Sequence, residues 1–468
     1  MTWVVCSDRF DWGAIDTAVE THTEWCRNPV LPDDCSDLEG LAGCAEDLDL
    51  DLVAHRLRIA GIDPFGTPIV ALDRVDRQSP RRVRTRLDAA SSRAVHYRGV
   101  AAGNVKTILP RVRSRRSFLT IGGPAYRVVP DADPARCRAT DGCTICVDAC
   151  PHGALEWTSG VVRKDRLACE ACGRCVAACP ADAMVHPTFT PDQLHAEMLA
   201  LARCCTEPFG VALNCSRGEP TAPAEGWFTL QVPCVGMVPP HWMIALLLYG
   251  AAAVVVPGCS CGVEADAEER VEATVDLARR WLASAGVDRG RERLARRTAP
   301  FPPGPLPPVE PPRPLFGACG AADVATMLGG IGVDDGAAPL GLVTISERCT
   351  GCGTCATACP TGALVSHTVD GGLSLMFDPA RCPGCGRCVA RCPEDGSISV
   401  RRTVQPVELG AGTRAVATHR LALCVGCGNA IATQTALDRI AVPLAGDVSV
   451  LKRVTSLCIE CRRTTMVF

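Results

Sequence analysis

The chain has 468 residues, 31 cysteines and a formal net charge of −3. A charge so close to zero gives no general reason to expect nucleic acid or anionic lipid as a partner, and the length predicts three or four domains. Secreted disulfide scaffolds are rich in cysteine but short. The sequence opens with MTWVVCSDRF, in which no basic region precedes an apolar one. We therefore expect a cytoplasmic chain whose cysteines bind metal.

No membrane span is predicted either. The most apolar stretch is residues 242–256, and Gly250 interrupts it. A helix that crosses a bilayer needs about 20 apolar residues, so this stretch is too short.

Residues 1–72 are predicted to form a small acidic α/β domain, with 14 acidic side chains against four arginines. The pattern predicts strands at 3–6 and 68–72 and helices at 14–26 and 48–60. The cysteines of this domain share no familiar spacing, and two alternatives stay open for them: small buried hydrophobic residues or an extra redox site. They are Cys6, Cys26, Cys35 and Cys44.

Residues 73–130 are predicted to be an irregular basic connector. Its first part, residues 73–116, holds 12 arginines and Lys106 against three aspartates. One interpretation is that the acidic domain rests on this connector, and another is that the connector docks an acidic partner. Nucleic acid is disfavoured because Tyr97 is the only aromatic residue in residues 73–116.

Sixteen cysteines fall into four runs of similar spacing, two in residues 131–187 and two in residues 343–401. Three runs follow the pattern C-x2-C-x2-C-x3-C-P, the signature of bacterial ferredoxins that bind [4Fe–4S] clusters. Zinc sites usually use two well-separated pairs instead. We therefore predict two ferredoxin-like modules with four [4Fe–4S] clusters. The runs are Cys137, Cys143, Cys146, Cys150; Cys169, Cys172, Cys175, Cys179; Cys349, Cys352, Cys355, Cys359; and Cys382, Cys385, Cys388, Cys392.

In such modules the fourth cysteine of one run binds the cluster of the other run. The first run departs from the pattern because five residues separate Cys137 from Cys143. Either Cys137 binds across a looped-out insert, or this cluster is a [3Fe–4S] centre. The predicted sets are Cys137, Cys143, Cys146 with Cys179; Cys169, Cys172, Cys175 with Cys150; Cys349, Cys352, Cys355 with Cys392; and Cys382, Cys385, Cys388 with Cys359.

Residues 192–297 alternate predicted helices and strands, which indicates a parallel sheet. Four cysteines follow its strands, namely Cys215, Cys234, Cys259 and Cys261. The ends of parallel strands meet at one edge, where ligand sites form, and four thiols there suit a [2Fe–2S] cluster. A degenerate domain kept as a docking platform is the alternative.

This stretch resembles the iron–sulfur (delta) subunit of methyl-viologen-reducing hydrogenase, in its ALNC strand, its VPCVGMV turn and its Gly-Cys loop after a buried strand. The resemblance implies a [2Fe–2S] cluster and partners such as flavoprotein, hydrogenase or heterodisulfide-reductase-like subunits that carry the catalysis. The chain departs from the family by a single cysteine in the first loop and a shortened Gly258-Cys259-Ser260-Cys261 loop.

Residues 298–317 are a proline-rich linker. Residues 402–468 are predicted to be a small domain with two C-x2-C knuckles, Cys424 with Cys427 and Cys458 with Cys461. Two such pairs suit a tetrahedral four-sulfur site for zinc or mononuclear iron, and another iron–sulfur centre is the alternative.

The fold class is therefore α+β and multidomain: two ferredoxin-like modules flank a parallel α/β domain, between an N-terminal α/β domain and a C-terminal metal knuckle. The expected function is electron transfer by a multi-cluster subunit of an oxidoreductase complex. The alternatives are a self-sufficient iron–sulfur reductase and a redox-sensing or scaffold protein. Dinucleotide and ATP binding are unsupported because the chain has no G-x-G-x-x-G or G-x4-G-K-[ST] motif.

Overall fold

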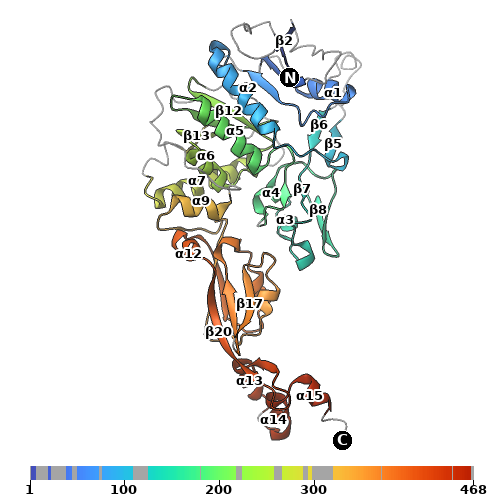
Figure 1. Cartoon of the computed structure of the whole chain (residues 1–468), viewed down its shortest axis with the longest axis vertical. Coiled ribbons are helices and arrows are strands. Elements are labelled where there is room, and N and C mark those ends of the chain that lie inside the picture. The colour runs from blue at the N-terminus through green and yellow to red at the C-terminus, as the bar shows by residue number, and fades with distance from the viewer. Residues whose placement is uncertain are drawn as a thin grey trace. The chain divides into compact units, whose positions relative to one another are not determined.

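The computed structural model describes most of the chain in two compact units (Figure 1). The first unit comprises residues 1–137, 146–158 and 162–324, and the second comprises residues 138–145, 159–161 and 325–468. The described residues are 2–6, 19–22, 38–44, 50–72, 76–108, 125–179, 181–217, 224–257, 266–287, 294–297, 320–369, 371–444 and 446–464. Cys26, Cys35, Cys259 and Cys261 lie outside them.

The N-terminal segment forms a four-stranded parallel sheet in the order β2-β1-β3-β4. Alternate residues of β1 point to opposite faces, so that Trp3 packs with α2 and Val4 packs with α1. The elements are β1 (Thr2–Cys6), β2 (Val19–His22), β3 (Leu38–Cys44), α1 (Leu50–Ile59), β4 (Ile69–Leu72) and α2 (Pro80–Ala94).

One expectation for this segment was wrong. The helix predicted over 14–26 is contradicted at β2, which pairs in parallel with β1 from Val19 to His22. The strand β3, from Leu38 to Cys44, lies between β1 and β4 in the same sheet. Pairing with neighbouring strands overrides local sequence preference here.

The basic connector is not irregular, because α2 is a helix of 15 residues that packs against α5 (Figure 1). Its arginines contact the middle domain rather than only the acidic one: Arg82 donates to the carbonyl of Trp227 at 2.6 Å and Arg86 to that of Thr229 at 2.5 Å. The connector also contains η2 (Asp76–Gln78), η3 (Ala102–Asn104) and the antiparallel pair β5 (Val105–Ile108) and β6 (Ala125–Val128).

The first cysteine-rich segment folds into short elements around a hairpin. The β8–β9 hairpin separates the two runs, and β10 pairs with β7. The elements are β7 (Asp131–Ala132), η5 (Ala139–Asp141), α3 (Ile145–Asp148), β8 (Leu155–Thr158), β9 (Val161–Lys164), α4 (Arg174–Ala178) and β10 (Met184–Val185).

The middle domain is a parallel sheet in the order β12-β11-β13-β14, as predicted. The strands β11 and β13 are buried along their whole length, which explains their continuous apolar sequence. The elements are α5 (Pro191–Cys204), β11 (Gly210–Cys215), β12 (Trp227–Val232), η6 (Val235–Met237), α6 (Pro240–Leu248), β13 (Ala253–Pro257), α7 (Ala267–Ser284) and β14 (Leu294–Arg297).

The second cysteine-rich segment again places a hairpin, β17–β18, between its runs. The strand β19 pairs with both β15 and β16, which gives a separate three-stranded sheet in the order β15-β19-β16. The elements are α9 (Ala321–Leu328), β15 (Val333–Asp334), β16 (Gly341–Ile345), α10 (Thr354–Thr357), β17 (Leu364–Val369), β18 (Gly372–Phe377), η7 (Pro379–Arg381), α11 (Arg387–Ala390) and β19 (Ile398–Val404).

The C-terminal segment continues this second sheet. The strand β20 pairs with β18 on one side and β21 on the other, giving the order β17-β18-β20-β21. None of the described helices is both long enough and apolar enough to span a bilayer. The remaining elements are α12 (Pro406–Gly410), β20 (Arg414–Leu423), β21 (Ala430–Thr433), α13 (Gln434–Ala441), α14 (Val448–Ser456) and α15 (Ile459–Thr464).

Candidate iron–sulfur and metal centres

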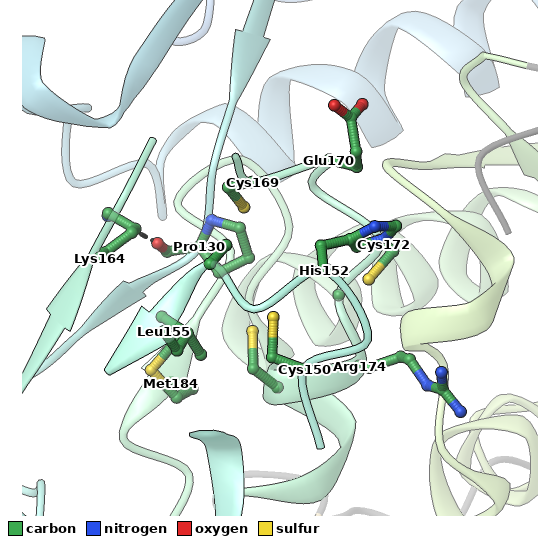
Figure 2. Close-up of a pocket in the computed structure, with 13 residues that line it drawn as sticks. Pro130, Cys150, His152, Leu155, Lys164, Cys169, Glu170, Cys172, Arg174 and Met184 are labelled. Carbon is green, nitrogen blue, oxygen red and sulfur yellow. Dashed lines mark hydrogen bonds between the residues drawn. The ribbon is translucent and has the colours of Figure 1, made fainter. Parts of the chain in front are cut away.

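One pocket of the first unit is lined by four cysteines, Cys150, Cys169, Cys172 and Cys175 (Figure 2). They are the set that the crossed ferredoxin pattern predicts, with one cysteine from the first run and three from the second. Leu155 and Met184 supply apolar walls, and Lys164 and Arg174 also line the pocket. Together, the four thiols and the largely apolar walls suit a thiolate-bound cluster.

Backbone geometry explains how the second run wraps around this pocket. Ala171 and Gly173 have positive φ angles of 52° and 74°, which turn the chain sharply between Cys169 and Cys175. Glycine adopts this conformation at little cost. Lys106 holds the start of the loop, since its Nζ donates to the carbonyls of Leu167 at 2.8 Å and Cys169 at 3.2 Å.

Two members of the other predicted set of this module lie in the first unit beside the pocket just described. Cys146 and Cys179 pack in one apolar cluster with Cys150 and Cys175.

The insert after Cys137 forms a compact turn. It contains η5, and Gly142 has a φ of 81°. The N–H of Cys143 donates to the carbonyl of Arg138 at 3.1 Å. This hydrogen bond closes the insert on itself, as expected for a looped-out segment.

The second module has two pockets, each lined by one of the predicted crossed sets. The first pocket contains Cys349, Cys352, Cys355 and Cys392, and the second contains Cys359, Cys382, Cys385 and Cys388. Apolar residues close both pockets, including Leu375 in the first and Phe377 in the second.

Several thiols accept hydrogen bonds from the backbone. Cys179 accepts from the N–H of Ala183 at 3.2 Å, and Cys359 accepts from that of Leu364 at 3.4 Å. Such bonds favour the thiolate, whereas burial and neighbouring thiols oppose it and raise the pKa of Cys382 to about 12. These cysteines would hold an iron–sulfur cluster as thiolates, and binding it would release their protons.

The middle domain brings two of its four predicted cysteines to one edge. Cys215 is the last residue of β11 and Cys234 follows β12, its parallel neighbour. Both are buried, and the thiol of Cys215 lies 3.8 Å from the carbonyl oxygen of Pro233. The strand β13 ends at the same edge with Pro257, and the predicted ligands Cys259 and Cys261 come after it, outside the described residues.

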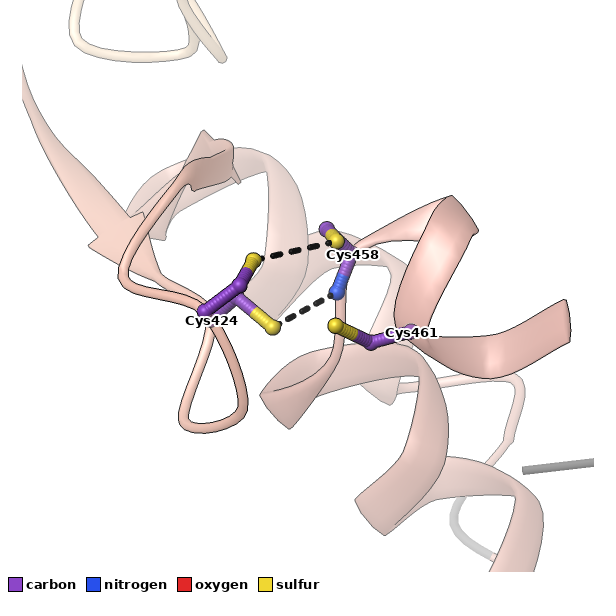
Figure 3. A group of neighbouring side chains, drawn as sticks. Cys424, Cys458 and Cys461 are labelled. Carbon is purple, nitrogen blue, oxygen red and sulfur yellow. Dashed lines mark hydrogen bonds between the residues drawn. The ribbon is translucent and has the colours of Figure 1, made fainter. Parts of the chain in front are cut away.

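The four C-terminal cysteines converge (Figure 3). The sulfur atoms of Cys424, Cys427, Cys458 and Cys461 all lie within 4.8 Å of one another. The N–H of Cys458 donates to Sγ of Cys424 at 3.2 Å and lowers the pKa of that thiol to about 6. Four mutually close sulfur atoms match the ligand set of a tetrahedral four-sulfur metal site.

The spacing of the cysteines predicted the candidate ligands, but it did not predict the residues that fix the ligand-bearing loops in place. Lys106 and Arg217 act through backbone carbonyls of residues 167–171. Every residue has a backbone carbonyl, so the sequence cannot show which carbonyl Lys106 or Arg217 contacts. Only the basic character of residues 73–116 pointed to internal partners for Lys106.

Comparison with known protein families supports the iron–sulfur assignment. Residues 132–186 and 348–396 match the family model of the 4Fe–4S dicluster domain. Residues 204–302 match that of the delta subunit of methyl-viologen-reducing hydrogenase. A search of curated proteins found no match. The chain therefore joins two 4Fe–4S dicluster domains to a segment like a hydrogenase delta subunit, and this combination supports a role in iron–sulfur electron transfer.

Proposed function

We propose that the chain is a multi-cluster electron-transfer subunit that relays electrons between a low-potential donor and a partner oxidoreductase. Iron–sulfur clusters supply one-electron chemistry, and the polypeptide sets their spacing, exposure and potential. The partners would be a flavoprotein or subunits of hydrogenase or heterodisulfide reductase type, which carry the catalytic reaction. The match to the hydrogenase delta subunit supports partners of the oxidoreductase class.

The observation that carries this proposal is the crossed arrangement of cysteines. In three pockets, three cysteines of one run are joined by the fourth cysteine of the other run. A zinc protein has no need of this exchange, whereas a dicluster ferredoxin requires it. The closed turn after Cys137 supports a fourth [4Fe–4S] cluster held by Cys137, Cys143, Cys146 and Cys179.

Two further centres belong to the proposal. The middle domain would hold a [2Fe–2S] cluster at the edge where Cys215 and Cys234 lie, with Cys259 and Cys261 as the remaining ligands. The C-terminal thiols would hold zinc, since Zn–S bonds of about 2.3 Å fit four mutually close sulfur atoms. Mononuclear iron is the alternative for that site.

Metal and sulfide analysis of anaerobically purified chain tests the proposal, together with EPR of the dithionite-reduced sample. We expect about 16 irons from four cubane clusters, about two more from the middle domain and about one zinc. Cys382→Ser should remove the signal of one cluster, whereas Cys204→Ser, outside the predicted ligand sets, should leave the spectrum unchanged. Several zincs with little iron would contradict electron transfer.

A further inference from the structure

The loop that carries Cys169, Cys172 and Cys175 is tied to the middle domain by Arg217. This arginine stands two residues after Cys215. Its Nη1 donates to the carbonyl of Glu170 at 2.7 Å and its Nη2 to that of Ala171 at 2.8 Å. One guanidinium therefore links the chain just before Cys172 to the chain just after Cys215.

A second contact involves Gly173, the residue after Cys172. A Cβ added at this glycine would lie 2.2 Å from the Cβ of Met237 and 3.2 Å from its Cα. Met237 ends η6, the turn that begins directly after Cys234. Only a residue without a side chain allows the two backbones to approach so closely, and the positive φ of Gly173 also favours glycine.

These contacts bring one predicted cluster loop against the carboxyl edge of the middle sheet. Arg174 adds an ion pair of 3.5 Å with Asp266, at the start of α7. The rate of electron transfer between metal centres falls steeply with their separation, so backbone contact between two ligand loops favours direct transfer.

We propose that this contact is an electron-transfer junction between the centre of Cys150, Cys169, Cys172 and Cys175 and the centre at Cys215 and Cys234. Arg217 and Gly173 are its positioning residues. One electron leaves the first centre, which is oxidised, and reduces the second, with no bond or proton moved; the reverse flow uses the same contact. The inference rests on the proposed function, because it needs both centres.

The test measures magnetic coupling between the two reduced centres by EPR of the full chain. Arg217→Ala should keep the iron content but weaken the coupling, and Arg217→Lys should do the same because an ammonium group lacks the planar fork that bridges two carbonyls. Arg84→Ala, at an exposed arginine of α2 that pairs with Asp88, is the matched control and should change nothing.

Gly173→Ala gives an independent variant, and hydrogen exchange of residues 169–175 adds a readout that does not depend on the clusters. We expect faster exchange there in Gly173→Ala and Arg217→Ala. Unchanged coupling and unchanged exchange in both variants would overturn the junction. If Cys215→Ser leaves the wild-type spectrum intact, the middle-domain centre itself is absent, which is a failure of the proposed function instead.

Discussion

At the scale of single residues, His241 is a buried base inside an apolar helix. Its side chain is 8% exposed, and its Nδ1 has no hydrogen-bond partner among the described residues. Burial lowers its pKa to about 3, because a protonated ring at this site would lose its hydration. The folded domain therefore holds this histidine neutral at neutral and mildly acidic pH.

The buried His241 should make the folded protein less stable in mild acid. Between the unfolded pKa near 6.5 and the folded value, the unfolded state binds the proton and the folded state does not. The free energy of unfolding therefore has its full value above pH 6.5 and falls as the pH is lowered. At pH 5 the loss is about 2 kcal/mol.

His241→Leu should remove this part of the pH dependence. Urea unfolding followed by tryptophan fluorescence at pH 7.5 and pH 5 measures it, since Trp242 is the next residue. His367→Leu, at an exposed residue of β17, is the control. Equal losses of stability in wild type and His241→Leu would contradict the argument.

Residue-scale features differ in how far the sequence predicts them. Three of the four predicted cysteine sets each line one pocket, and the sequence could predict this grouping because loop geometry fixes the cysteine spacing of cluster-binding modules. The positions of Arg217 and Gly173 were not predictable, because their partners are backbone atoms of segments far away in the chain. Nothing in the sequence therefore shows which segments Arg217 and Gly173 contact.

At the scale of elements, α5 begins with a complete capping box. The Thr190 hydroxyl accepts from the N–H of Gln193 at 3.3 Å, and the Gln193 side chain accepts from the N–H of Thr190 at 2.9 Å. This cap fixes the start of the helix that packs against α2.

Thr190→Ala should therefore destabilise the first unit by about 1 kcal/mol, the usual effect of losing such a cap. Thr190→Ser keeps the hydroxyl and should cost much less. Urea unfolding at pH 7.5 compares the two variants. A serine variant as unstable as the alanine variant would show that packing of the threonine methyl group, not the cap, matters.

Elements with local sequence signals, such as a helix cap, were predicted well. Elements that depend on pairing with a distant strand were not. The helix α5 opens the stretch where alternating helices and strands were predicted, and its proline, cap and apolar stripe are all local signals. The segment 14–26 has helical spacing of apolar residues, but β2 forms there because β1 offers a free edge. The basic helix α2 was missed because its arginines suggested a solvated connector rather than contacts with buried carbonyls.

At the scale of the whole molecule, strand pairing extends beyond the cysteine-rich segments. The strand β20 joins β18, so the chain after residue 401 adds to the sheet of the second module before it reaches the metal knuckle. The buried hydroxyl of Thr433 also donates to the carbonyl of Thr350, which precedes Cys352 in the first cluster loop of that module. The strands β20 and β21 therefore have support that does not depend on the four C-terminal thiols.

The helices beyond these strands lack comparable support. Helices α14 and α15 contain no buried residue. Two of the four thiols proposed to bind metal belong to this part of the chain: Cys458 lies just before α15 and Cys461 lies within it. The bound metal should therefore hold this terminus together, as in small metal-stapled domains.

Cys427→Ser combined with Cys461→Ser should release the zinc and expose residues 448–464 to proteolysis while the iron content stays unchanged. Metal analysis and limited proteolysis of the full chain measure both effects, and Ser449→Ala, at an exposed position of α14, is the control. Loss of iron together with zinc would mean that the knuckle supports the second module as well. A terminus that resists proteolysis without its metal would instead mean that helix packing alone holds it.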